Sequence, residues 1–229
     1  MTSEGDKVLV RRTKEDALAT RHSLLDAAEL LFQAQGVSGT SLAEIAQKAG
    51  TTRGAIYWHF KDKADLFNAM LERVTLPLEA CVQRVAAEAA DPVAEIRRAM
   101  AEALGRTARD ARTRRVFEVA TLKVEYTAEL RAVQQRHLAV RGMCLAQIEQ
   151  GLRRAARQRG QRLPVPATVA ARGLHALIDG LIYNWMLDTE AFDLVRSGTR
   201  ALDAYLTGLG LARGSDRPLR HSPHPPAAR

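Results

Sequence analysis

The segment GTSLAEIAQKAGTTRGAIYWHFKDKADLF, residues 39–67, decides the fold expected for this chain. Its first half is typical of a short helix, because Ser41 and Glu44 form a capping box and apolar residues follow at helical spacing. Gly50 is placed to end this helix, and Thr52 begins a second short helix after a tight turn. Two short helices joined by a glycine-containing turn predict a helix-turn-helix unit.

The second short helix carries more polar and aromatic groups than a helix that only packs into a core. Ile56 and Phe60 are four residues apart and form one inward stripe. We interpret Trp58 and Phe60 as core residues, and Tyr57 and His59 as residues that contact a partner. Each of the four also admits the opposite role, because aromatic residues serve both purposes.

The rest of the chain is expected to be helical, since no alternating strand pattern bounded by turn residues occurs. The first helix is expected over Lys14–Gln35 and ends at Gly36, and the fourth begins at Lys61 or Asp62 and bends at Pro77. Later helices are expected at Pro92–Arg109, Thr113–Leu122, Ala128–Gln158, Ala167–Leu187 and Leu194–Leu209. The fold class is therefore all-α: a three-helix, helix-turn-helix N-terminal domain and a larger helical domain.

Composition indicates a soluble cytoplasmic protein. The 229 residues are 46% apolar and 26% charged, no apolar run approaches the roughly 20 residues that span a bilayer, and the N-terminus has no signal-peptide core. The two cysteines, Cys81 and Cys144, lie in no metal-ligand motif. An enzyme is the main alternative class, but no phosphate loop or nucleophile elbow occurs. We expect no cofactor, no metal and no catalytic residue.

The net charge of +8 suggests a polyanionic partner, but most of the basic excess lies away from the helix-turn-helix. Residues 97–162 hold 16 Lys and Arg against 6 Asp and Glu. The runs DARTRR and RRAARQRGQR either form a second nucleic-acid patch or are solvated helix faces, and we favour solvated faces.

The segment 39–67 resembles the DNA-binding part of TetR-family transcriptional repressors. The similarity extends through VRRTKEDALATR before it, DARTRRVFE in the middle and DGLIYNW near the end. Within that family, the segment also resembles the branch of AcrR/TtgR-type multidrug-efflux regulators. The resemblance implies a homodimer that binds a palindromic double-stranded DNA operator and is released by a small apolar or aromatic drug. The alternative is a regulator of the same family that answers an endogenous metabolite or a fatty acyl compound.

The resemblance also implies which residues contact DNA. The implied base-side positions are Thr52, Arg53 and Gly54, and the implied backbone contacts are Thr40, Thr51, Tyr57, His59 and Lys63. Residues 1–13 are expected to be a flexible basic arm, residues 14–65 the DNA-binding domain, residues 66–212 the ligand-binding and dimerisation domain, and residues 213–229 a disordered tail.

The ligand pocket implied by the resemblance is lined by Phe117, Thr121, Asp179 and Tyr183. Asp179 also attracts attention in the sequence alone, because an acid within HALIDGLI is expected to be buried without an evident partner. It accepts from a ligand donor, meets a cationic compound, or bonds a neighbouring backbone or side chain across a dimer seam. The last two long helices are expected to form that seam, with packing inside one monomer as the alternative.

Overall fold

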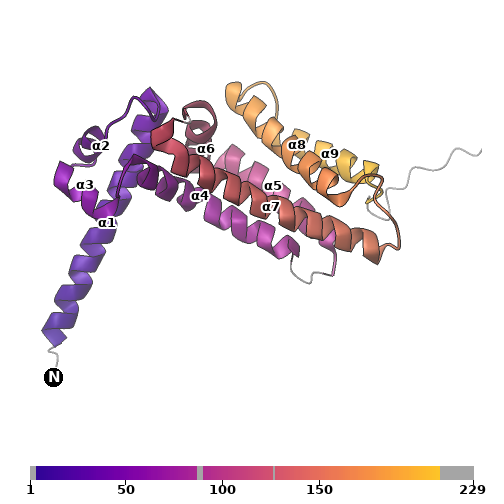
Figure 1. The fold of residues 1–229 in the computed structure, drawn as a ribbon, viewed down its shortest axis with the longest axis horizontal. Helices are drawn as coiled ribbons and strands as arrows, with labels where there is room; N and C mark the ends of the chain where they lie inside the picture. The colour runs from indigo at the N-terminus through magenta and orange to yellow at the C-terminus, as the bar shows by residue number, and fades with distance from the viewer. Residues whose placement is uncertain (1–3, 87–89, 126, 212–229) are drawn as a thin grey trace, which may run out of the picture.

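The computed structural model describes residues 4–86, 90–125 and 127–211, and this part of the chain is helical with no strand (Figure 1). The elements are α1 (Glu4–Gln35), α2 (Leu42–Lys48), α3 (Arg53–His59), α4 (Lys63–Ala86), α5 (Pro92–Arg109), α6 (Ala111–Leu122), the 3-10 helix η1 (Ala128–Leu130), α7 (Arg131–Gln158), α8 (Ala167–Leu187) and α9 (Leu194–Gly208). The all-α prediction is confirmed.

The largest difference from the sequence-based boundaries is at the N-terminus. Helix α1 begins at Glu4 rather than Lys14, so most of the predicted flexible arm is helical. No proline interrupts residues 4–35, and a helix already anchored at one end extends at little cost per residue. Helix α4 begins at Lys63 and continues through Pro77 to Ala86. The described residues end at Leu211, so the predicted disordered tail, residues 213–229, lies outside them.

Local signals position the two short helices as predicted. Gly36 and Gly50 adopt φ of 79° and 68°, a left-handed conformation that favours glycine after a helix end. The Ser41 amide donates to Glu44 Oε2 at 2.7 Å, and the Glu44 amide donates to Ser41 Oγ at 3.2 Å, which completes the capping box. Thr52 caps α3 by accepting from the Ala55 amide at 3.2 Å.

The DNA-binding unit and the larger domain share one hydrophobic core. Phe32 of α1 and Phe67 of α4 lie with ring centroids 5.9 Å apart, and Val116 and Val119 of α6 are buried in the same cluster. The predicted domain boundary at residues 65 and 66 therefore falls near the start of α4, inside a continuous core. Helix α6 packs against α1, and α1 in turn packs against α2 and α3.

A second core joins the helices of the larger domain. Helices α8 and α9 lie side by side at the end of the molecule opposite α2 and α3, and α7 packs against both α4 and α8 (Figure 1). This core contains Ile96, Leu104, Leu152, Leu174 and Leu202, all almost fully buried. It uses one face of α8 and α9 and leaves another face exposed.

The arginines of DARTRR do not form the solvated helix face that the sequence analysis favours. Arg112 and Arg115 approach the buried carboxylate of Glu29 in α1 at 3.4 and 3.8 Å. The Arg114 guanidinium lies over the Trp185 ring at 5.0 Å. The segment is therefore a structural junction, because its cations meet a buried acid and a buried aromatic ring.

Candidate nucleic-acid interface and ligand cavity

Helix α3 buries one narrow stripe and exposes the rest of its surface. Ile56 and Phe60 are 0% and 1% exposed, as predicted, and Tyr57 is half exposed. The core interpretation of Trp58 is wrong, because its side chain is 91% exposed. Trp58 lies two residues from Ile56, which is about 200° around the helix and therefore on the opposite face.

Gly54 has no structural requirement inside the monomer. A Cβ built on it would meet only the Thr52 hydroxyl, at 3.9 Å, which is an ordinary contact. Its φ is not positive, so an alanine would fit and would be a better helix former. The exposed surface around Gly54, with Arg53 beside it and Thr52 at the cap, is open to close approach by another molecule.

A groove of about 480 Å³ runs between the start of α2 and the α3–α4 turn. It brings together four of the residues predicted to contact DNA, namely Thr40, Arg53, Tyr57 and Lys63. The other four do not line it: Thr52 and Gly54 are exposed, while Thr51 and His59 are half-buried. The predicted set therefore spans α3, its N-terminal turn and this neighbouring groove.

Two predicted contact residues have their side chains turned into the protein. The Lys63 ammonium donates to the carbonyls of Val37 and Thr40 at 3.2 and 3.1 Å, and the Thr40 hydroxyl donates to the Gly36 carbonyl at 2.7 Å. The carbonyls of the α1–α2 turn need donors, which explains why a lysine is buried here. Both side chains hold the turn that orients α2.

Arg21 holds the C-terminal end of α3 and is not among the residues predicted from the sequence. Its guanidinium donates to the His59 carbonyl at 2.9 Å and lies over the Phe60 ring at 4.4 Å. A cation at the C-terminal end of α3 is stabilising, because this end of the helix dipole is negative. Arg21 and His59 are 38 residues apart, so no local pattern indicates this contact.

All four residues predicted to bind a ligand line one cavity of about 600 Å³ in the larger domain. Phe117 and Thr121 come from α6, and Asp179 and Tyr183 come from α8. Leu71, Met100, Ile148, Ile178 and Met186 supply apolar walls. This volume and this mostly apolar lining are typical of small-molecule sites.

The burial predicted for Asp179 is wrong. Its side chain is 63% exposed, and its Oδ2 lies 2.8 Å from Nδ1 of His175, one turn earlier on α8. The apolar run around Asp179 suggested burial, but a helix of 21 residues has an outward face even when its composition is apolar. Asp179 has the partner that the sequence did not reveal.

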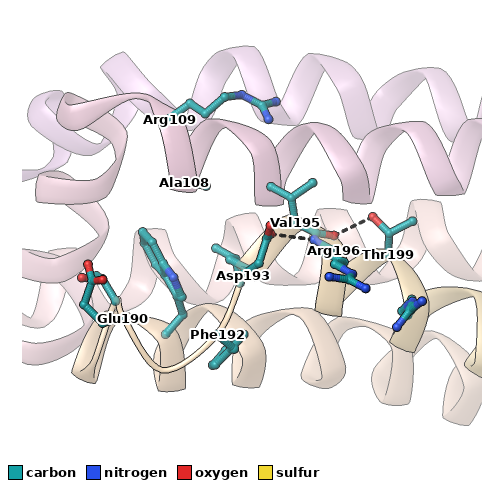
Figure 2. Close-up of a pocket in the computed structure, with 12 residues that line it drawn as sticks. Ala108, Arg109, Glu190, Phe192, Asp193, Val195, Arg196 and Thr199 are labelled. Carbon is teal, nitrogen blue, oxygen red and sulfur yellow. Dashed lines mark hydrogen bonds between the residues drawn. The ribbon is translucent and has the colours of Figure 1, made fainter.

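A wider, open groove lies beside the α8–α9 connection and has none of the predicted ligand residues in its lining. In Figure 2, Asp193 caps α9 by accepting from the Arg196 amide at 2.9 Å, and Thr199 donates to the Val195 carbonyl at 2.7 Å. These polar groups are engaged in local helix bonds. The apolar cavity is the better candidate for a small ligand.

Comparison with known proteins identifies the family. Residues 24–70 match the family described as bacterial regulatory proteins, tetR family, and residues 91–210 match the C-terminal region of MAATS-type transcriptional repressors. The chain belongs to the TetR family. It is 38% identical over 208 residues to the HTH-type transcriptional regulator TtgR of Pseudomonas putida, an alignment that covers 90% of this chain and 97% of TtgR.

Solved structures of TetR-family repressors superpose on most of the chain. NalD, the secondary repressor of the MexAB-OprM multidrug efflux pump in Pseudomonas aeruginosa, is 39% identical with a TM-score of 0.78, covering 85% of this chain and 98% of NalD. The SmeT–triclosan complex is 36% identical with a TM-score of 0.77, covering 91% and 100%, and SmeT represses the SmeDEF pump of Stenotrophomonas maltophilia. This TetR-family protein is thus a transcriptional repressor, and the prediction that it is not an enzyme is confirmed.

Proposed function

We propose that this repressor binds a palindromic operator as a homodimer, controls a multidrug efflux operon, and is released by an apolar or aromatic compound in the 600 Å³ cavity. The efflux assignment is supported by NalD and SmeT, which repress multidrug pumps and resemble this chain over most of its length. We favour drugs over an endogenous metabolite for the same reason.

The observation that carries the DNA-binding proposal is the exposed face of α3 around Gly54. An α-helix fits the major groove, where base edges are distinguishable, and a glycine lets the helix backbone approach closely. We assign Thr52, Arg53 and Gly54 to the base side, and Thr51, Tyr57 and His59 to the phosphate backbone. Thr40 and Lys63 act by holding the turn before α2 in place, because their side chains bond to that turn.

The dimer proposal rests on an exposed stripe of α8. Val169 and Leu187 are 49% and 58% exposed, and with Ala176 and Gly180 they lie within a narrow sector of the helix. A Cβ on Gly180 would meet nothing within 4 Å, so this strip is open to a second helix. A second copy of the chain would bury it and would set the spacing of two α3 helices.

Effector release is proposed to pass through α6, which has two occupied faces. Phe117 and Thr121 line the cavity, while Arg115 approaches Glu29 in α1 and Glu118 accepts a hydrogen bond of 2.7 Å from Gln33. A compound that displaces α6 would strain these bonds to α1. It would thereby favour a conformer in which the two α3 helices no longer match successive major grooves.

The experiment that tests DNA binding compares two Gly→Ala variants that fit equally well in the free protein. Gly54→Ala and Gly142→Ala each add a methyl group in open space on a helix. Both should raise the unfolding free energy by up to about 1 kcal/mol. Only Gly54→Ala should weaken binding to the intergenic DNA upstream of the gene, by at least about tenfold in fluorescence anisotropy. Unchanged affinity for Gly54→Ala would show that α3 does not approach DNA at this position.

The effector is tested on the same complex. Triclosan, which is present in the SmeT complex, should dissociate the protein from the DNA fragment. A bulky Ala103→Trp change in the cavity wall should reduce that release without changing DNA affinity in the absence of compound. Release that is unaffected by Ala103→Trp would place the effector elsewhere.

A further inference from the structure

The ionisable groups of the cavity are gathered between α7 and α8. His137 and Arg141 are one turn apart on α7, and His175 and Asp179 are one turn apart on α8. Arg141, His175 and Asp179 all act electrostatically on His137, so the four groups are neighbours. We call these four residues the polar pole of the cavity. It gives an otherwise apolar cavity one end where a charged or polar ligand group can be recognised.

The carboxylate of the polar pole already has a partner. Asp179 Oδ2 lies 2.8 Å from His175 Nδ1, and both residues belong to the same helix. A ligand cation would have to compete with this contact. It would also meet two guanidinium groups, because Arg136 and Arg141 both line the cavity.

The two arginines differ in their partners. Arg136 Nη2 lies 3.6 Å from the Glu72 carboxylate of α4. Arg141 forms no ion pair with any residue that the structure describes, and it is exposed at the edge of the cavity. A guanidinium is always charged and binds carboxylates through two parallel hydrogen bonds. Arg141 is therefore the cation that a ligand anion can reach.

His137 adds a donor without adding charge. Burial lowers the pKa of His137; the Asp179 carboxylate opposes this effect, and the Arg141 guanidinium adds to it. The imidazole is consequently neutral near pH 7, and one of its nitrogens carries a hydrogen that can be donated. A ligand oxygen held by Arg141 would find this second donor one turn away on α7.

We propose that the effector is an apolar compound with a carboxylate or similar acidic group, held by Arg141 while its apolar body fills the cavity. This inference rests on the proposed function, because it defines the ligand class of the same cavity. Lipophilic cations are disfavoured, since the one lining carboxylate is engaged by His175 and both guanidinium groups repel them.

The test uses three probes that share one ring system: 2-naphthoate, 2-naphthylmethanol and 2-naphthylmethylammonium. Isothermal titration calorimetry on the full chain at pH 7 should rank the acid first and the ammonium last. In Arg141→Gln, the ratio of acid affinity to alcohol affinity should fall by at least about tenfold, because a charge-assisted pair is lost. In Asp179→Asn, the preference for the acid should persist.

A matched control is Arg153→Gln. Arg153 is an exposed arginine on the same helix, paired with Glu149 and absent from the cavity lining, so its removal should leave all three affinities unchanged. DNA binding without probe verifies that each variant is folded.

Three results would overturn the inference. Tightest binding of the ammonium probe, abolished in Asp179→Asn, would show a cation site. Equal affinities for all probes in both the parent and Arg141→Gln would show that the cavity does not distinguish ligands by charge. If the probes still released the DNA in that case, the proposed function would stand without this inference. Failure of all three probes and of triclosan to bind would remove the cavity as the effector site. Both the acidic-ligand inference and the effector part of the proposed function would then fail.

Discussion

The carboxylate of Glu29 in α1 lies 3.2 Å from Nη1 of Arg73 in α4, with only 1% of the Glu29 side chain exposed. The same carboxylate faces Arg112 and Arg115 of α6, while Arg73 and Arg112 also pair with Asp26 at 2.8 Å. One buried acid therefore links three helices, two of which, α4 and α6, line the ligand cavity. The cluster is the polar part of the junction between the cavity and the helix-turn-helix.

The first prediction concerns the pH dependence of stability. Burial raises the pKa of Glu29 above 4.5, and the neighbouring arginines only partly offset this effect. Because the folded state holds this proton more tightly than the unfolded state, the stability that Glu29 contributes is fully present below pH 4.5 and is lost as pH rises through its folded pKa. The difference in unfolding free energy between the parent and Glu29→Gln should therefore fall as pH increases.

Urea unfolding followed by circular dichroism, at pH values from about 4 to about 7, measures this difference. A difference that rises with pH would mean that the arginines dominate over burial. In that case the pKa of Glu29 would be lowered, and the cluster would be a stabilising ion-pair network at neutral pH.

The second prediction concerns Glu129, which brings a negative charge into the proposed DNA groove. Its Oε1 lies 3.5 Å from Lys63 Nζ, and it lines the groove beside Arg53 and Tyr57. An incoming phosphate would be repelled, so Glu129→Gln should tighten operator binding by about two- to tenfold at low salt, with a smaller effect at high salt. Glu149→Gln, on the distant part of α7, is the control. Weaker binding of Glu129→Gln would show that the contact with Lys63 organises the groove for DNA.

The third prediction uses the two tryptophans as separate reporters. Trp58 is 91% exposed on α3, whereas Trp185 is 6% exposed beneath Arg114. In Trp185→Phe, the remaining emission should be that of a solvated indole and should change when operator DNA is added. In Trp58→Phe, DNA should leave the emission almost unchanged. A DNA-dependent change confined to Trp58→Phe would place the interface away from α3.

The fourth prediction concerns packing between α5 and α9. A Cβ on Gly198 would come within 2.5 Å of Leu104 Cδ1, a side chain that is itself fully buried. Gly198→Ala should therefore destabilise the protein by about 1–3 kcal/mol, although alanine is the better helix former. Gly208→Ala on the same helix meets nothing within 4 Å and should be neutral or slightly stabilising. Thermal unfolding distinguishes the two, and equal effects would show that α9 moves away freely.

Local signals explain what was predictable in the fold. The limits of α5 and α8 agree with the sequence-based ranges, and the capping box at Ser41 and the glycine after α1 are where the pattern places them. Capping, helical periodicity and left-handed glycines each depend on residues within a few positions of one another. The sequence-based range starts α1 at Lys14 and the structure starts it at Glu4, because no proline lies between them to stop the helix.

The sequence by itself determined the helix-turn-helix and the family, because each depends on a short-range pattern or on a motif along the chain. Through the family resemblance it also indicated Phe117, Thr121, Asp179 and Tyr183, which line the cavity. Only the tertiary structure decided which side chains those elements expose and pair. It exposed Trp58, turned Lys63 inward, gave Asp179 its His175 partner and brought Arg21 to the end of α3. These outcomes depend on the relative rotation of packed helices and on charges meeting across long sequence separations, and neither quantity is encoded in a local pattern.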